Sequence, residues 1–398
     1  MTIAGSPGGR GDLTPGPRTT TASSPLPGAA LDELADAVAA GAAVAGLGES
    51  TRFASETFGV RDQIFRRLVQ KHRFRALALQ DDAAVGATLD AYVTGGEGTA
   101  AAALESAWRP WRTAEMAAAL QWIRSFNRDN PDDAVRIFGV RPAQARAADY
   151  DAVLDHVRRT APHRLAELAA HLEPIRTAHE IDEHVQRARG LHPGRPFAEH
   201  ARDALAIVER LPGGSALARM RLIVDFHERS VAGRGTYAGD ARAWAGAIID
   251  HQRETSRRVA YWDGMAHTSA APATLGLAPQ RGPQPTVGSE LRHHYGAAYV
   301  SVAIGFHHGD LGVATVPEPA PDWLDARLAA AGRPAHWLDL RADRLRGQWD
   351  GPAKARVISG VYDPSRDAAE HLAVASLTGA FDVLVHLRRV SPVRPLPA

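Results

Sequence analysis

The sequence predicts an α/β protein with a mostly parallel sheet flanked by helices and with a large helical insertion. Short apolar runs alternate with helical patterns over residues 29–140 and again over residues 258–391. Such alternation is typical of parallel strands that are buried on both faces. Between residues 141 and 257 the apolar runs stop, whereas helical periodicity continues. We therefore expect one α/β core that is interrupted by a group of helices.

The elements of the core follow from the spacing of the apolar residues. Val60, Ile64, Phe65 and Leu68, for example, mark the buried face of one helix. The first part of the core is expected to contain helices over 31–40, 57–72, 82–93 and 113–129 and strands over 43–48, 75–80 and 135–140. The second part is expected to contain strands over 259–264, 298–305, 336–340, 355–360 and 381–387.

The region from 141 to 257 indicates four or five helices, with Ala204, Ile207, Val208 and Leu211 at helical spacing. We expect this insertion to cover the carboxyl-terminal edge of the sheet and to form a wall of the main pocket. Residues 1–28 are rich in Gly, Pro, Ser and Thr, which favours a disordered tail. Residues 392–398 are expected to form a second, short tail.

Composition excludes several classes of partner and site. The chain has 46 basic and 45 acidic residues, which argues against nucleic acid or an anionic membrane as the main partner. It has no cysteine, so a disulfide framework, a thiolate nucleophile and a cysteine zinc site are all excluded. No apolar run approaches the roughly 20 residues of a membrane helix, and the N-terminus lacks the apolar core of a secretory signal. We expect a cytoplasmic protein of open oligomeric state.

The most informative segment runs from Gly46 to Glu56. An apolar strand ends there in a Gly-Glu turn, and two acids, Glu49 and Glu56, flank Arg52 before a helix begins. Open α/β sheets bind ligands where a strand runs into a loop and then a helix. The segment is therefore the first candidate for a functional site.

This loop resembles the G-E-x-T-H-G-x-x-E signature of the erythromycin esterase-like family, and the resemblance extends from about residue 30 to the C-terminus. Arg52 stands where the family has its catalytic histidine, and Arg61 matches a characteristic arginine. Gln80 ends a strand at which the family has a functional glutamate. The segment from Val259 to His267 is similar to the family's W-x-H-N-x-H strand end, with Gly264 in place of the first histidine and His267 kept.

The resemblance implies a hydrolytic site whose proton-handling groups are largely replaced. An arginine keeps its charge at any useful pH and cannot take a proton from water. We expect the catalytic residues to be His267, Glu49 and Glu56, and the substrate-binding residues to be Arg52, Arg61 and Gln80. Arg52 and Arg61 are suited to clamp a carboxylate or phosphate. Each residue also has a structural interpretation: an internal ion pair for Glu49, packing for His267 and an ordinary polar strand end for Gln80.

No metal and no cofactor are expected in this cleft. His179-Glu180-Ile181-Asp182-Glu183-His184 nearly imitates a zinc-protease helix, but its histidines are five positions apart, whereas the motif requires four. His307 and His308 follow a predicted strand. Adjacent strand residues point to opposite faces, so we do not expect both to be ligands.

Three functions remain open at this point. The leading one is an enzyme that tailors a polyketide- or peptide-like natural product by elimination, dehydration, cyclisation or transfer. A surviving ester or lactone hydrolase, with Glu56 or His267 as the base, is the second. The third is a non-catalytic protein that binds a small molecule.

Overall fold

The computed structural model of the protein describes residues 26–188, 190–192, 194–230, 232, 237–358 and 362–397. The expected N-terminal tail lies outside the described residues except for its last three positions. Among the described helices, none combines the length and the apolar character that crossing a membrane requires.

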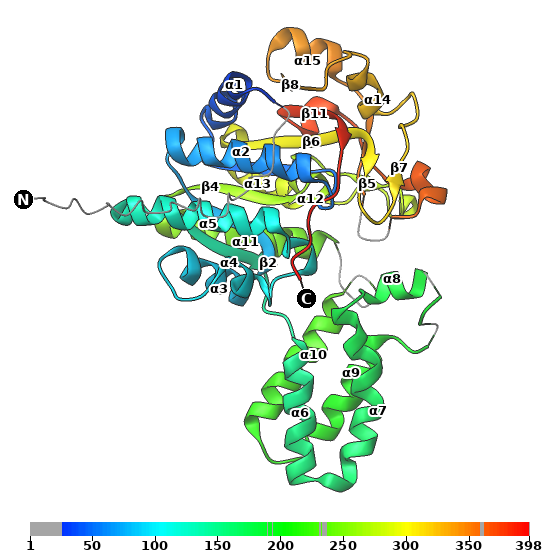
Figure 1. The fold of residues 1–398 in the computed structure, drawn as a ribbon. Helices are drawn as coiled ribbons and strands as arrows, with labels where there is room; N and C mark the ends of the chain where they lie inside the picture. Colours follow the sequence, from blue (N-terminus) through cyan, green and yellow to red (C-terminus); the bar gives the residue numbers. More distant parts are fainter. Residues whose placement is uncertain are drawn as a thin grey trace, which may run out of the picture.

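A mixed, mostly parallel sheet of eight strands forms the centre of the molecule (Figure 1). Its path is β3-β2-β4-β1-β6-β11-β8, with β7 paired to β6. Along this path, the strands from β3 to β11 pair parallel with one another. In contrast, β8 pairs antiparallel with β11, and β7 pairs antiparallel with β6. The members are β1 (Val44–Glu49), β2 (Phe74–Asp82), β3 (Arg136–Arg141), β4 (Arg258–Gly264), β6 (Tyr299–Asp310), β7 (Thr315–Val316), β8 (Ala335–Asp339) and β11 (Val383–Val390). The expected fold class is confirmed.

One expected strand belongs elsewhere. The apolar run predicted over 355–360 becomes β9 (Ala353–Arg356), which pairs antiparallel with β10 (His371–Val374) in a separate sheet that also contains β5 (Thr274–Leu275). Lys354 is exposed, and Arg356, although buried, carries a charge that is paired with Asp367. Such a strand is too polar for the centre of a sheet that is buried on both faces.

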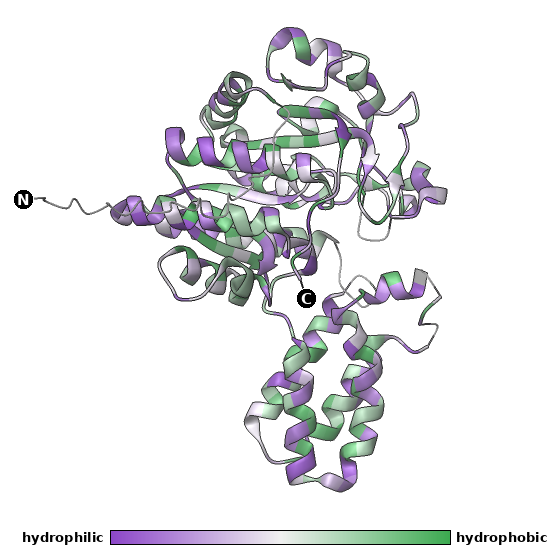
Figure 2. Ribbon diagram, in the orientation of Figure 1, coloured by the Kyte–Doolittle hydropathy of each residue, from purple (hydrophilic) through white to green (hydrophobic). Residues whose placement is uncertain are grey.

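Helices cover both faces of the large sheet because successive strand residues point to opposite sides. On one side, Ala45 and Leu47 of β1 share a core with α1 (Gly28–Ala39), α2 (Ser55–His72), α3 (Ala83–Val93), α4 (Ala100–Leu104) and α5 (Ala114–Asp129). On the other side, Val44 packs with α11 (Tyr237–Thr255) and α13 (Val287–Tyr295). The strands accordingly form an apolar band through the centre of the core (Figure 2).

Four helices between β3 and α11 form a bundle with an apolar core of its own, which lies apart from the sheet in Figure 1. They are α6 (Ala147–Thr160), α7 (Leu165–Arg176), α9 (Phe197–Val208) and α10 (Gly214–Arg229), with the short α8 (Glu183–Ala188) at one end. The last helix of the expected insertion, α11, packs on the sheet through Trp244 and Ile248. An amphipathic pattern reports a buried face but not what covers it, so the sequence did not separate α11 from the bundle.

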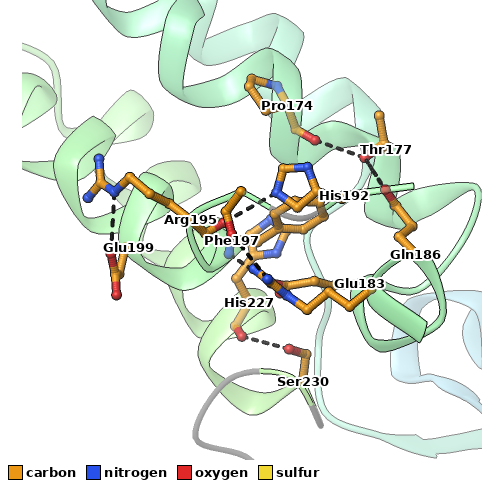
Figure 3. A network of polar contacts seen from close by, with 12 residues as sticks. Pro174, Thr177, Glu183, Gln186, His192, Arg195, Phe197, Glu199, His227 and Ser230 are labelled. Atoms are coloured by element: carbon orange, nitrogen blue, oxygen red, sulfur yellow. Dashed lines mark hydrogen bonds and ion pairs between the residues drawn. The ribbon is translucent and has the colours of Figure 1, made fainter. Parts of the chain in front are cut away.

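The zinc-like motif at the end of this bundle serves the fold. Glu183 is buried, and its carboxylate accepts hydrogen bonds from the Nε of Arg187 (2.8 Å) and the backbone N–H of Phe197 (3.0 Å). His227 is buried close by, and its Nε2 lies 2.7 Å from the hydroxyl of Tyr150. In Figure 3, Glu183 of α8 reaches Phe197 of α9, and His227 of α10 lies close by. Glu183 therefore caps and ties helices together.

The remaining elements are short. They comprise α12 (Met265–Thr268), α14 (Leu324–Ala329), α15 (Asp343–Trp349), α16 (Leu377–Ala380) and the 3₁₀ turns Arg109–Trp111, Pro131–Asp133, Pro162–Arg164, Thr177–His179, Pro279–Arg281, Gly296–Ala298 and Pro364–Ala369. Of these, α12 and the turn at Arg109–Trp111 carry residues of the candidate site.

The expected C-terminal tail packs against two loops of the core. The backbone N–H of Val393 donates to the carbonyl of Phe53 (3.0 Å), and that of Leu396 donates to the carbonyl of Arg112 (2.9 Å). Arg394 forms an ion pair of 3.2 Å with the buried Glu115. This segment therefore ties the loop of Arg52 to the segment that precedes α5.

Removing residues 391–398 is expected to lower the free energy of unfolding by about 2–4 kcal/mol. Several hydrogen bonds of about 1 kcal/mol each are lost, and Glu115 loses an ion-pair partner. Urea denaturation of the truncated and full-length chains measures the difference. Removing only residues 397–398 is the matched control, and equal stability of all three proteins would contradict the account.

Candidate functional site

Three neighbouring strands bring polar side chains to the carboxyl edge of the sheet. In the register of the sheet, Glu49 at the end of β1 lies opposite Gly264 of β4 and Ile304 of β6. On the other side of β4, Leu79 of β2 lies opposite Trp262, so Gln80 and Asp263 follow as neighbours. This is the edge at which the sequence places its candidate site.

Two arginines and two carboxylates form a chain of ion pairs there. Arg61 of α2 lies 2.7 Å from Glu49. The Nε of Arg52 lies 4.0 Å from the same carboxylate, and its Nη2 donates both to Asp263 and to the side-chain oxygen of Gln80. Both guanidinium groups, which we expected to clamp a substrate anion, are therefore neutralised by carboxylates of the chain itself.

Asp263 is a member of this cluster that the sequence interpretation missed. It is fully buried, accepts a hydrogen bond from the hydroxyl of Tyr261, and accepts another from the backbone N–H of Gly264 (2.6 Å). The available signal was an acid at the end of an apolar strand, next to the position that lacks the family's histidine. Its partner Arg52 lies 211 residues away in the sequence, so the pairing itself was not visible.

Aromatic rings enclose both guanidinium groups. The Cζ of Arg61 lies 4.6 Å from the ring centre of Trp262 and 5.2 Å from that of Trp111. The Cζ of Arg52 lies 4.7 Å from the ring centre of Trp108. Arginine stacks readily on aromatic faces. The rings hold the two arginines and exclude water from the ion pairs.

Gln80 and Asp81, at the end of β2, hold two of the enclosing tryptophans in place. The backbone N–H of Trp108 donates to Asp81 (2.7 Å), and the indole N–H of Trp111 donates to the carbonyl of Gln80 (3.2 Å). Asp82, next in sequence, accepts from the backbone N–H groups of Ala84 and Val85. Asp82 therefore caps α3, whereas Asp81 anchors the tryptophan segment.

The ion pair of Arg61 and Glu49 is closed to solvent. Arg61 is 0% exposed and Glu49 is 1% exposed. Burial raises the pKa of Glu49, and the positive charges of Arg61 and Arg52 oppose that rise. Apart from their contact with each other, both oxygens of Glu49 and all three guanidinium nitrogens of Arg61 have no hydrogen-bond partner. Arg52 keeps the largest exposure of this group, 15% of its side chain.

Glycine at position 264 makes room for the arginine at position 52. A Cβ atom at Gly264 would lie 3.3 Å from the Nη1 of Arg52, which is tighter than an ordinary contact. A larger side chain there would push the guanidinium away from Asp263. The two departures from the family pattern, at positions 52 and 264, are therefore sterically coupled.

His267 lies on α12, beside the cluster rather than within it. The helix is held against the sheet because the carbonyl of Thr268 accepts from the hydroxyls of Tyr299 (2.7 Å) and Ser301 (2.6 Å). Gly48 permits this close approach, since a Cβ there would lie 2.0 Å from the hydroxyl oxygen of Thr268. The ring of His267 lies against Trp244 of α11, with the ring centres 5.2 Å apart.

The surroundings of His267 keep its imidazole neutral near pH 7. Burial lowers the pKa of His267, and the negative charge of Asp263 opposes that fall. A cavity of about 70 Å³ opens beside the ring. Its wall is largely small and apolar, and its polar lining groups are Asp240, Arg281, Gln284 and Thr286. A neutral imidazole that faces a cavity is suited to accept a proton.

Glu56 does not join the cluster. Its carboxylate accepts hydrogen bonds from the backbone N–H (2.7 Å) and the hydroxyl (2.6 Å) of Ser391 in the C-terminal segment. Glu56 occupies the first turn of α2, where a negative charge is favourable. The structure thus brings together Glu49, Arg52, Arg61 and Gln80, places His267 at their side, and leaves Glu56 apart.

The cluster offers little to a cation, because Glu49 and Asp263 are already paired with arginines. The one group of described residues with metal-ligand spacing, His307, His308 and Glu318, lies further along β6 and after β7.

Substituting Arg52→His, which restores the residue type of the family pattern, is expected to destabilise the protein by about 1.5–3 kcal/mol. A histidine is too short to keep both partners, so the buried Asp263 loses its charged donor and Gln80 loses its hydrogen bond. Ester hydrolysis is not expected to appear, because Gln80 and Gly264 remain changed. Thermal unfolding and an assay with simple esters measure the two effects. A stable variant with new esterase activity would contradict the prediction.

The fold was compared with those of known proteins. Sequence comparison with curated proteins gave no match. Among solved structures, a Bacillus cereus protein has a TM-score of 0.64 at 19% identity, covering 95% of this chain and 96% of that chain. A succinoglycan biosynthesis protein has a TM-score of 0.62 at 20% identity, with 94% and 95% covered. A variant of the erythromycin esterase EreC in its open conformation has a TM-score of 0.56 at 17% identity, with 90% and 93% covered.

These likenesses show the fold. The family model described as erythromycin esterase matches residues 69–390, which is most of the chain and includes all of the strands from β2 to β11. The chain belongs to the erythromycin esterase family.

Proposed function

We propose that this protein converts a small molecule by a non-hydrolytic step in which His267 carries the proton. The observation that supports it most is the position of Arg52. Its guanidinium, bound to Asp263 and Gln80 against Gly264, stands where the family resemblance places a water-activating histidine. An arginine cannot serve as the base there, and Glu49 is already paired with Arg61.

The cavity beside His267 is the place proposed for the reacting group. His267 borders it from α12, and Asp240 and Ala241 border it from α11, so α11 supplies one wall. Burial raises the pKa of Asp240, which favours a carboxyl group that can return the proton. A volume of about 70 Å³ holds a few heavy atoms. We infer that one end of a larger substrate enters it.

The substrate class follows from this lining and from the family. A largely apolar wall with a few polar groups suits a neutral or weakly polar natural product, of polyketide or peptide type, in the cytoplasm. Elimination, dehydration, cyclisation or transfer each need one group that moves a proton. Because both arginines of the cluster are paired with carboxylates of the chain, they are not assigned to an anionic group of the substrate.

Ester or lactone hydrolysis is the second candidate, and one observation favours it. A neutral His267 beside a cavity is also able to activate water, and the family is named for an esterase.

Mass spectrometry of reactions with a panel of lactone- and ester-containing natural products tests the proposal. The expected result is a product that has not gained water: one of unchanged mass, one lighter by water or another eliminated group, or one heavier by a transferred group. A product that has gained one water would favour the hydrolase. Binding without any product, at saturating protein, would favour the third function, a small-molecule-binding protein.

A further inference from the structure

A pair of adjacent histidines near the end of β6 converges instead of pointing to opposite faces. The Nδ1 atoms of His307 and His308 lie 2.9 Å apart, with the two rings inclined at 80°. Gly309 follows the pair with a φ of 154° and lies close to β11, since a Cβ at that position would lie 2.2 Å from the carbonyl oxygen of Val390. The expectation that adjacent strand residues diverge was therefore wrong at this pair.

A carboxylate completes the group. One donor atom from each of His307, His308 and Glu318 lies within 4.8 Å of the others. Two nitrogen ligands of a zinc ion, at about 2.0–2.1 Å from the metal, lie about 2.9–3.4 Å from each other. The histidine pair already has this separation, and Glu318 is exposed, so its side chain can close the remaining gap by rotation.

The surrounding groups hold this arrangement without filling it. His307 is buried, and the ring of His386 lies behind it with the centres 6.4 Å apart. Arg356 fixes the segment of Glu318 by donating to the carbonyl of Pro317 (3.1 Å), while its other nitrogen pairs with Asp367 (2.5 Å). The nearby positive charge of Arg356 is thus committed to a carboxylate.

We propose that His307, His308 and Glu318 bind a divalent transition-metal ion of the zinc type. Two imidazole nitrogens and a carboxylate oxygen are ligands that zinc accepts, and three protein ligands leave one coordination position for water. The site would join β6 to the segment after β7. His307 lies three residues beyond Ile304, the β6 neighbour of Glu49, or about 10 Å along the strand. It is therefore separate from the arginine cluster and from the cavity at His267.

The test uses the full-length protein, prepared without a histidine tag and stripped with a chelator. Calorimetric titration with Zn²⁺ is expected to show one ion per chain, and Co²⁺ is expected to give visible absorption bands of nitrogen and oxygen coordination. His308→Ala and Glu318→Gln should each weaken Zn²⁺ binding at least about tenfold, since even the loss of an outer-shell partner costs about 10–100-fold. Both side chains lie outside the core, so these variants are expected to fold.

A second histidine pair provides the matched control. His293 and His294 of α13 are adjacent and exposed, so His293→Ala/His294→Ala should bind Zn²⁺ as the unmodified protein does. Zn²⁺ should also raise the melting temperature of the unmodified protein more than that of Glu318→Gln. Three results would overturn the proposal: no binding of Zn²⁺ or Co²⁺, binding unaffected by His308→Ala and Glu318→Gln, or binding lost in the control.

Discussion

Replacing Arg61 by methionine is expected to lower the free energy of unfolding by about 3–5 kcal/mol at neutral pH. Arg61 is fully buried, and its guanidinium is the nearest charge to the carboxylate of Glu49 at 2.7 Å. Without it, an ionised carboxylate remains in a site that water cannot reach. Chemical denaturation followed by circular dichroism measures the loss.

The double variant Arg61→Met/Glu49→Met should recover much of that stability, because replacing a buried pair by apolar groups is often neutral. Arg67→Met is the matched control on the same helix. Its partner Asp32 is exposed, so the loss should be small. If Arg61→Met loses no more free energy of unfolding than Arg67→Met, Arg61 does not stabilise the charge of Glu49. The description of a closed ion-pair cluster would then be wrong.

The same variant should show a characteristic dependence on pH. Burial already raises the pKa of Glu49, and Arg61 is the positive group that opposes this rise most strongly. Removing Arg61 therefore raises the pKa of Glu49 further. The folded variant then binds a proton more readily than the unfolded chain. Its stability deficit is therefore expected to shrink on acidification, because Glu49 takes up a proton in the folded variant before it does so in the unfolded chain. A deficit that grows on acidification would contradict this sign.

Substituting His267→Ala is expected to reduce turnover by about 10²- to 10⁴-fold, the range for loss of a general base. Binding of the same substrate should change by only a few-fold, because the wall of the cavity beside His267 is largely apolar. The experiment compares turnover and affinity on the substrate that the natural-product panel identifies. His294→Ala, an exposed histidine of α13, is the matched control and should keep full activity.

The pH profile separates a proton-transfer role from a packing role. Burial lowers the pKa of His267, so the acid limb of the activity profile should lie below the ordinary histidine value of about 6.5. A variant with a merely loosened cavity would keep this limb. If His267→Ala retains both the rate and the acid limb, His267 is a packing residue beside Trp244.

The sequence predicted the core strands well for a physical reason. β1, β2 and β4 are buried on both faces, and an uninterrupted apolar run reports that burial directly. It could not report which sheet β9 joins or that β8 runs antiparallel, because pairing depends on residues far away in the chain. The same limit applies to α11, whose apolar face fits the sheet as well as it would fit a bundle.

The candidate site was predictable to the same extent. Strand ends placed Glu49 and Gln80 at one edge, and the resemblance added Arg52, Arg61 and His267. The partners of these residues were not predictable, since Asp263 binds Arg52 across 211 positions. Glu56 lies close to Glu49 in sequence, yet the first turn of α2 directs it to Ser391. Two residues that are close in sequence can therefore bind different partners when a helix begins between them.

Under the proposed function, Arg52 replaces a water-activating group and the reaction proceeds by proton transfer at His267. The decisive test is conversion of the identified substrate by the unmodified protein in water enriched in oxygen-18. The label also reveals hidden attack by water, such as a lactone that opens and closes again without a change in mass. The account predicts a product that carries no label from the solvent. Incorporation of oxygen-18 at the rate of turnover would contradict it and would establish the protein as a hydrolase.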